Sequence, residues 1–450
     1  MNNMKVVAVG NPSLAGTGGE RRNYMTLSEY SEFGVQSYLH LPFFKLAWAL
    51  LNSDNKPDLL DQLRKNVYKI QDKGVKIQSM CLDILDTPSV YLKDKSFQRI
   101  LNKRHPYLYW YFQSLIDDSS EIHRKYISTT LKETIGFDLV YQMGEPTQYG
   151  YDAQIISKKS HLPMVVLLQE FPYKIHNPKL YLSSLTNRPR STLFSLFFDI
   201  VSYPFSYNFY RRILNSTELK GIFSVSPACF EARNLKKNLI RTKKFSKTLY
   251  PENAVEAQSQ VTNINKENYA IYYARMVPEK GLYEIPKIAS YIGDKIKVLV
   301  YGKFPNEAFR RNFLKSISQI PNIEYKGFAE REELMESIRR AKVVIYPSHA
   351  DAFPLVIIEA LSLGTSVVAY RIPGLIPYEK LPVVKLVKEF DHIALAREAK
   401  EVIELSSSEY SSLHDLPDVK NFVKDHGSWS SVTEEEIKTL RNLKSGHLIT

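Results

Sequence analysis

The stretch from Val343 to Tyr370 reads VVIYPSHADAFPLVIIEALSLGTSVVAY and predicts a strand, a loop, a helix and a second strand. Apolar residues at successive positions up to Tyr346 are typical of a strand that is covered on both faces. The helix is predicted to start at Pro354 and to run to Leu363, because proline suits the first helical position and Gly364 suits the stop. A strand–helix–strand unit of this kind indicates a parallel sheet.

Similar units recur along the chain. Short runs rich in β-branched residues, each followed by helical spacing, predict strands at Val6–Val9, Val75–Ser79, Leu139–Gln142, Met164–Gln169, Gly221–Ser226, Tyr269–Ala274, Ile296–Tyr301, Ile323–Gly327, Val343–Tyr346 and Ser366–Tyr370. With 450 residues the chain exceeds what one hydrophobic core usually serves. The fold class is therefore α/β, with two doubly wound parallel-sheet domains.

The domain boundary is predicted near Pro251-Glu252-Asn253, where a polar stretch begins and continues to Asn268. Residues 1–250 would form the N-terminal domain, joined by a C-terminal helix at about 430–450. Residues 251–429 would form the C-terminal domain.

Composition excludes several classes of protein. A hydrophobic content of 44% is that of an ordinary globular chain, and two cysteines, Cys81 and Cys229, cannot build a disulfide scaffold. The N-terminus shows no secretory signal, and no window reaches the length of apolar residues that a membrane span needs. We expect a cytoplasmic protein, with peripheral attachment to the inner face of the membrane as an open alternative.

The net charge of +12 is unevenly distributed. Residues 1–250 hold 34 Lys and Arg against 21 Asp and Glu, whereas residues 251–450 hold 26 against 27. The basic half either meets an anionic partner, such as lipid headgroups, a polyphosphate carrier or nucleic acid, or serves solubility alone. We expect no nucleic acid, because the chain shows no zinc, helix-turn-helix or RNA-binding signature.

Two segments of this half bear on a membrane. Leu193–Tyr210 is rich in aromatic residues and flanked by arginines, which suits either a membrane interface or a buried helix pair. Downstream, a helical spacing would place Arg233, Lys237, Arg241 and Lys244 on one face. That face would be simply solvated or would attract anionic headgroups.

Glu359 is the only charged residue within the predicted helix 354–363. A carboxylate on a nearly apolar helix must be paired, since burying it without a partner costs several kcal/mol of folding free energy. Its partner is either a diol that donates two hydroxyls or an arginine elsewhere in the chain. The free amides at the start of the helix would hold an anion.

At these residues the sequence resembles the family 4 retaining glycosyltransferases, whose signature places an acidic residue eight positions before a Glu. The elements that match are Pro347-Ser348, Asp351, Phe353-Pro354, Glu359-Ala360 and Gly364. Asp351 stands where the family usually has Glu, which shortens that side chain by one methylene group. Upstream, YAIYYARMVPEKG (269–281) is similar to the loop that carries the family's Arg and Lys, here Arg275 and Lys280.

The resemblance implies a GT-B architecture, in which two Rossmann-like domains face each other across a cleft. It implies a nucleotide-diphosphate sugar as donor, with the diphosphate at Phe353, Pro354 and Leu355. Arg275 and Lys280 would neutralise the diphosphate without a metal or other cofactor, Asp351 would contact the sugar and Glu359 the ribose. Lys326-Gly327 would border the base, and Gly18 and Gly19 would approach the donor from the other domain.

The acceptor does not follow from the resemblance. The family often has a His after its fourth or fifth strand, whereas this chain has Leu168-Gln169-Glu170-Phe171 there. A carbohydrate and a lipid-phosphate-linked glycan both remain open as acceptors. The alternative to a transferase is a degenerate member that binds nucleotide sugar or anionic lipid without transfer.

Overall fold

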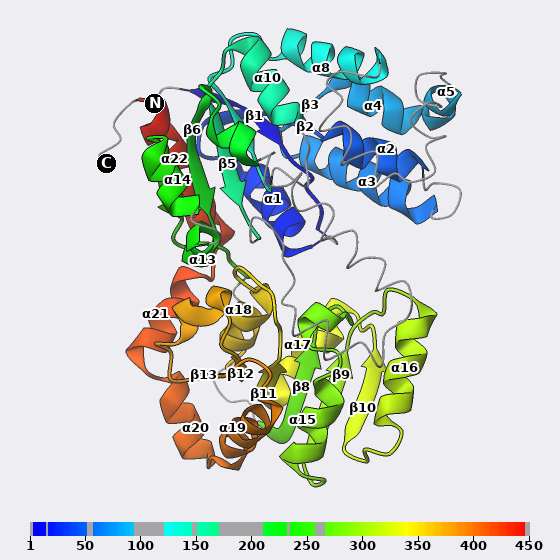
Figure 1. Cartoon of the computed structure of the whole chain (residues 1–450), viewed down its shortest axis with the longest axis vertical. Coiled ribbons are helices and arrows are strands. Elements are labelled where there is room, and N and C mark those ends of the chain that lie inside the picture. Colours follow the sequence, from blue (N-terminus) through cyan, green and yellow to red (C-terminus); the bar gives the residue numbers. More distant parts are fainter. Residues whose placement is uncertain are drawn as a thin grey trace. The chain divides into compact units, whose positions relative to one another are not determined.

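The computed structural model describes residues 3–14, 17–51, 57–93, 121–145, 151–170, 210–231, 235–256 and 266–445 (Figure 1). The chain divides into two compact units. The N-terminal unit holds the described parts of Met1–Tyr173, Val201–Glu252 and Trp429–Thr450, and the C-terminal unit holds those of Asn253–Ser428. The last helix therefore belongs to the N-terminal unit, as the red helix among blue and green elements in Figure 1 shows.

The N-terminal unit is built on one parallel sheet. Its described strands, in sheet order, are β3 (Lys76–Ile77), β2 (Val35–His40), β1 (Met4–Val9), β4 (Leu139–Gln142), β5 (Met164–Leu168), β6 (Leu219–Ser224) and β7 (Phe245–Thr248). Its described helices are α1 (Gly18–Glu29), α2 (Phe43–Leu51), α3 (Pro57–Gln71), α4 (Ser79–Asp86), α5 (Pro88–Leu92), α8 (Glu121–Glu133), α10 (Asp152–Ser160), α13 (Pro227–Glu231), α14 (Leu235–Arg241) and α22 (Trp429–Lys444). The central strands are buried along their whole length, as a sheet covered on both faces requires.

The C-terminal unit repeats this plan. Its described strands, in sheet order, are β10 (Ile323–Gly327), β9 (Lys297–Tyr301), β8 (Glu267–Tyr273), β11 (Ala341–Tyr346), β12 (Ser366–Tyr370) and β13 (Val384–Val387), all parallel. Its described helices are α15 (Ile285–Ile292), α16 (Glu307–Ile317), α17 (Arg331–Arg340), α18 (Leu355–Ser362), α19 (His392–Glu404), α20 (Ser407–His414) and α21 (Pro417–Asp425), with the 3₁₀ turns η2 (Pro278–Lys280) and η3 (Pro373–Tyr378).

Both sheets have the doubly wound strand order, which confirms the predicted fold class. The order reverses between β1 and β4 in one unit and between β8 and β11 in the other. In sheets of this kind ligands bind at the carboxyl ends of the strands that flank the reversal. The loops after β8 and β11 are therefore where a ligand of the C-terminal unit is expected.

Several local predictions need correction. The strand predicted at Val75–Ser79 is shorter in the structure, where β3 covers only Lys76–Ile77, because α4 already begins at Ser79. Pro354 is the N-cap of α18 and has an extended backbone, so the helix begins one residue later than expected. The strands β2, β7 and β13 are additional to those predicted.

The predicted basic helix face needs correction at one end: Lys237 and Arg241 lie four residues apart on α14, Arg233 lies outside the described residues, and Lys244 lies beyond the helix. Helix α14 ends at Arg241, and the left-handed backbone of Lys243 separates it from β7. Lys244 donates to the main-chain oxygen of Ser216 at 2.8 Å, so it does not continue a helical face. The segment Leu193–Tyr210 lies outside the described residues except for Tyr210, which is buried. Within the described ranges no helix is long and apolar enough to cross a membrane.

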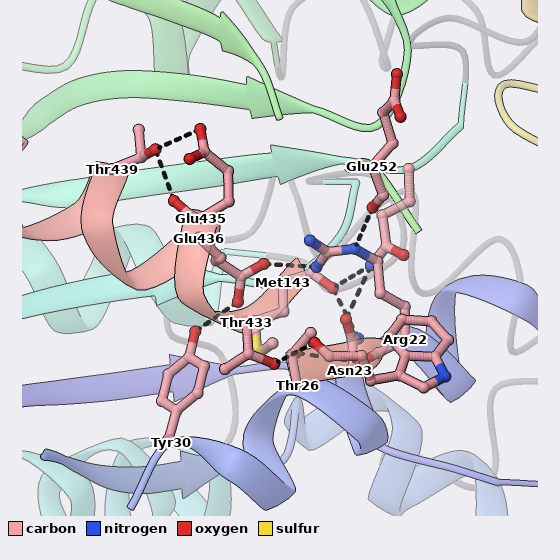
Figure 2. A network of polar contacts seen from close by, with 12 residues as sticks. Arg22, Asn23, Thr26, Tyr30, Met143, Glu252, Thr433, Glu435, Glu436 and Thr439 are labelled. Carbon is pink, nitrogen blue, oxygen red and sulfur yellow. Dashed lines mark hydrogen bonds and ion pairs between the residues drawn. The ribbon is translucent and has the colours of Figure 1, made fainter. Parts of the chain in front are cut away.

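A buried ion pair ties α22 into the N-terminal unit (Figure 2). Arg22 of α1 and Glu436 of α22 are both fully buried, with Nη1 and Oε2 at 2.6 Å. Tyr30 donates to the other carboxylate oxygen at 2.6 Å, and Arg22 Nε donates to the main-chain oxygen of Glu252 at 3.1 Å. The guanidinium thus joins the first helix of the chain, the last helix and the residue at which the chain leaves this unit.

We expect Glu436→Gln to lower the free energy of unfolding of the N-terminal unit by about 3–5 kcal/mol, because it leaves the Arg22 guanidinium buried without its counter-ion. Trp48 and Trp429 lie in this unit, so tryptophan fluorescence during urea unfolding measures the change. Glu379→Gln, which breaks an exposed pair with Arg371, is the control and should leave the transition nearly unchanged. Equal effects of the two substitutions would contradict the assignment.

Candidate functional site

Asp351 lies in the loop after β11 and accepts three hydrogen bonds on one carboxylate oxygen. The donors to Oδ2 are Lys280 Nζ at 2.5 Å, Ser348 Oγ at 2.9 Å and the hydroxyl of Tyr346. The side chains of Lys280 and Asp351 are 13% and 18% exposed, so a ligand can still reach them. Burial and the Asp351 charge raise the pKa of Tyr346, which remains a neutral donor.

The loops after β8 and β11 are packed directly against each other. His349 N donates to the main-chain oxygen of Glu279 at 2.8 Å, which links the two loops. Gly281 has φ +80°, and a Cβ there would lie 2.3 Å from the Pro347 carbonyl oxygen. Only glycine permits both this backbone conformation and this approach. The contact places Lys280, the residue before this glycine, beside the Asp351 loop.

Arg275 lies in the same loop as Lys280 and is exposed. Within the described ranges its side chain has no hydrogen bond or ion pair, whereas Lys280 is engaged by Asp351 and by the Ala350 carbonyl at 3.1 Å. One cation of the predicted pair is thus free to meet an anion, and the other already forms part of the loop structure.

Glu359 is 8% exposed on α18, and its partner is Arg331, the first residue of α17. Nη1 of Arg331 lies 3.1 Å from Oε1 of Glu359, and the arginine side chain is 45% exposed. The structure therefore shows the arginine alternative for this carboxylate. The amides of Leu355 and Val356, at the first two helical positions, have no partner within the helix.

The other predicted donor residues of the C-terminal unit lie at the end of β10 and at the start of α18. Lys326 and Gly327 end β10, where Lys326 pairs with Glu324 at 2.6 Å and Gly327 has φ +83°. Phe328, the next residue, is 73% exposed. Phe353 is buried, with its ring 5.1 Å from that of Tyr378, so its side chain supports the start of α18 instead of lining an open surface.

In the N-terminal unit, Gly18 and Gly19 are the first two residues of α1. Thr17 caps the helix and forms a capping box with Glu20. A Cβ on Gly19 would lie 3.0 Å from Oε1 of Gln169, whose Nε2 donates to Asn23 Oδ1 at 2.9 Å. Gln169, which follows β5, therefore lies against the glycine turn, near the position where the resembling family has its His.

Glu145 follows β4 at the carboxyl edge of the same sheet and is buried. It accepts from the amide of Gln169 at 2.5 Å and from that of Glu170. Burial, and then the Glu170 charge, raise the pKa of Glu145 to about 7. This carboxyl group was not identified from the sequence, because nothing in the local pattern marks it as buried.

Other residues of the site were also missed. Tyr346 and Ser348 hold Asp351, and Gly374 in η3 leaves no room for a side chain, since a Cβ there would lie 1.9 Å from the Asp351 carbonyl oxygen. Tyr346 directly precedes the signature and Ser348 belongs to it, so their contact with Asp351 could have been inferred from their nearness in sequence. Arg331 and Gly374 come from distant segments that only the fold brings together.

No group of three or more His, Cys, Asp and Glu is placed to hold a metal ion within the part of the chain that the structure describes. The polar groups around Asp351 are instead cations, hydroxyls and helix amides. Their chemistry suits a negatively charged, hydroxylated ligand.

Two doubly wound units, with Lys280, Asp351 and Glu359 around the strand reversal of the second, agree with the GT-B fold that the resemblance implied. Residues 254–414 match the family model described as Glycosyl transferases group 1. This match covers both loops, α17 and α18. It includes the predicted donor residues of the C-terminal unit.

Comparison with known proteins agrees with this class. A stretch of 108 residues is 25% identical to the putative teichuronic acid biosynthesis glycosyltransferase TuaC of Bacillus subtilis (strain 168); it spans 24% of this chain and 26% of that protein's length. The structure of Anabaena Alr3699/HepE in complex with UDP and glucose aligns with a TM-score of 0.59 at 11% identity, over 98% of this chain and 100% of that one. Sucrose-phosphate synthase (tll1590) of Thermosynechococcus elongatus aligns with a TM-score of 0.62 at 14% identity, over 98% and 100% of the two chains. Together the matches support a glycosyltransferase with the GT-B fold, as the sequence predicted.

Tyr346→Phe should destabilise the C-terminal unit by about 1.5–3 kcal/mol, because Asp351 loses a hydrogen bond to a charged acceptor. Tyr370→Phe is a matched control, since Tyr370 ends the neighbouring strand and its buried hydroxyl has no hydrogen-bond partner among the described residues. Removing that hydroxyl should leave stability unchanged or raise it. Calorimetric unfolding that showed the same loss for both variants would refute a specific role for the Tyr346 hydroxyl.

Proposed function

We propose that this chain is a retaining glycosyltransferase that moves a sugar from a nucleotide-diphosphate donor to a carbohydrate or lipid-linked acceptor. The observation that carries the proposal is the pairing of Lys280 with Asp351 at the strand reversal, within the segment that matches the group 1 model. A cation and a carboxylate held together and still partly exposed suit a ligand that has both phosphates and hydroxyls.

In this proposal the donor diphosphate lies at the free amides of Leu355 and Val356, with Arg275 as a further cation. The bond between the anomeric carbon and the diphosphate oxygen breaks, and the acceptor oxygen bonds to that carbon on the same face. The acceptor proton passes to the departing phosphate oxygen. Charge grows on the leaving group as the bond breaks, so Arg275 and Lys280 act most strongly in the transition state.

The two carboxylates would bind hydroxyl groups of the donor. Asp351 has one oxygen saturated by its three donors, and its other oxygen would accept from the sugar. Glu359 would accept from the two ribose hydroxyls. The Arg331 side chain is 45% exposed, so its charge stays in contact with water whether or not it remains paired with Glu359.

No metal is included in this mechanism. Arg275 and the amides of α18 are the groups that would stabilise the negative charge of the departing diphosphate, while Lys280 cancels the charge of Asp351. The proposal therefore assigns neutralisation of the diphosphate to the protein alone.

A donor screen tests the function as a whole. The full chain is incubated with a panel of nucleotide sugars, and mass spectrometry scores hydrolysis or transfer for each, with and without EDTA. We expect turnover of at least one donor and no effect of the chelator. Binding without turnover would favour a degenerate sugar-nucleotide binder, and activity restored by manganese or magnesium after EDTA would overturn the metal-free mechanism.

Glu359→Gln should weaken donor affinity about 10- to 150-fold, because the amide replaces a charged acceptor of two hydroxyls. Isothermal titration with the donor found in the screen measures the change. Glu336→Gln on α17, an exposed carboxylate paired with Arg339 and Arg340, is the control and should bind as the wild type does. Unchanged affinity in a folded Glu359→Gln protein would remove this residue from the site.

Arg275→Ala should lower kcat more than it raises KM, because the charge of the leaving group is greatest in the transition state. Arg311→Ala, at an exposed position on α16, provides the control. Steady-state kinetics over a range of donor concentrations separate the two parameters. A variant with an unchanged kcat and a raised KM would assign Arg275 to ground-state binding.

We further propose that the enzyme works on the cytoplasmic side and that its acceptor is linked to a lipid phosphate at an anionic membrane. The support is the excess of positive charge in residues 1–250. Basic residues near an anionic surface contribute about 1 kcal/mol each, and this attraction weakens as salt rises.

Liposome co-sedimentation checks the membrane proposal. We expect the protein to sediment with vesicles that contain phosphatidylserine at low salt, and much less at high salt. Neutral phosphatidylcholine vesicles should retain little protein. Equal binding to both lipids, or none to either, would favour a soluble carbohydrate acceptor.

A further inference from the structure

His349 lies two residues before Asp351, and its side chain is 1% exposed. Its ring nitrogens face two carboxylates: Nδ1 lies 2.8 Å from Oε1 of Glu389, and Nε2 lies 3.6 Å from Oε2 of Glu284. Neither Nε2 nor this Glu284 oxygen has a hydrogen-bond partner within the described part of the chain. The histidine therefore lies between two acidic groups in the interior.

These partners come from different elements of the C-terminal unit. Glu284 precedes α15, Glu389 follows β13, and Tyr370 at the end of β12 has its ring 5.3 Å from the imidazole. Phe390, with φ +69°, stacks on the imidazole at 4.5 Å.

Two further groups complete the surroundings of the ring. Turn η2 contributes the main-chain carbonyl of Glu279 to the His349 amide. Asp391 adds negative charge near Tyr370. The titratable groups around the imidazole are therefore carboxylates and a phenol.

Such surroundings favour the imidazolium. Only the protonated ring donates from both nitrogens, whereas the neutral ring would turn a lone pair toward one carboxylate. Burial lowers the pKa of His349, but the hydrogen bond to Glu389 and the charges of Glu284 and Glu389 outweigh it, so the pKa lies above its usual value.

The same residue connects to both loops of the donor site. Its main-chain amide donates to the main-chain oxygen of Glu279, which precedes Lys280. Displacement of His349 would move the backbone that carries Asp351 and would loosen its link to the Lys280 loop.

We propose that His349, held as an imidazolium between Glu284 and Glu389, is a positioning residue that fixes the Asp351 and Lys280 loops in register. The fixing of the two loops by His349 is hereafter the His349 clamp. The clamp itself does not depend on the proposed function. Only its importance for binding a sugar donor does. Because the folded pKa is raised, the clamp contributes fully below about pH 6.5, the unperturbed value, and is lost as pH rises through the folded value.

Hydrogen exchange of the full chain tests the clamp without any ligand. After correction for intrinsic rates, protection of residues 274–281 and 346–353 should fall about tenfold between roughly pH 6 and pH 9 in the wild type. His349→Gln should show the lower protection at both pH values. Glu389→Gln, at a partly exposed partner, should reduce the pH difference with less risk to folding.

His414→Gln is the matched control, because this histidine of α20 contacts Ser366 and lies away from both loops. This variant should show the same fall in hydrogen-exchange protection between the two pH values as the wild type. The proposal would be overturned if protection in the wild type did not fall between the two pH values. It would also be overturned if His349→Gln or Glu389→Gln showed the full wild-type fall in protection.

UDP titrations at the same two pH values separate this inference from the proposed function. We expect wild-type affinity to fall with pH and the affinity of His349→Gln to be low and flat. A wild type that shows the exchange difference but does not bind UDP or any nucleotide sugar would refute the function and leave the clamp intact. A wild type that binds UDP but lacks the exchange difference would refute the clamp alone.

Discussion

The hydrogen bonds around Asp351 are the interaction on which the candidate site depends. The doubly wound topology brings the ends of β8 and β11 together at the strand reversal, and Gly281 lets the two loops touch. Lys280 then neutralises a carboxylate that would otherwise repel an incoming diphosphate. The fold thus supplies the proximity, and the ion pair makes that proximity compatible with an anionic ligand.

The sequence predicted the strands that are apolar on both faces, because several apolar, β-branched residues in succession are typical of a strand covered on both faces. It missed β2, whose residues VQSYLH include polar positions, and the half-buried edge strand β7, whose residues FSKT show no apolar run. The same strand explains why Lys244 does not continue the predicted basic helix face. Charge spacing alone predicts a helix wherever lysines recur, and it does not detect that Phe245 begins a strand.

Within the site, local spacing was sufficient for some residues and insufficient for others. Asp351 and Glu359 are close in sequence on one loop and helix, so their spacing predicts their joint position. Arg331 reaches Glu359 only because α17 packs beside β8 and β11, and no pattern within α17 distinguishes it from its other arginines. The sequence did limit the partner of Glu359 to an arginine or a diol, and the structure shows the first without removing the second.

The carboxyl edges of the two sheets differ in charge, and the difference follows the chemistry proposed for each. In the C-terminal unit the loop after β8 carries Arg275 and Lys280, which suit a leaving group that gains negative charge. In the N-terminal unit the described residues that follow β4 and β5 are Glu145, Gln169 and Glu170, none of them cationic. Hydroxyl groups can bind beside such side chains, whereas a phosphate there would meet an acidic pair in which burial, and then the Glu170 charge, already raise the pKa of Glu145.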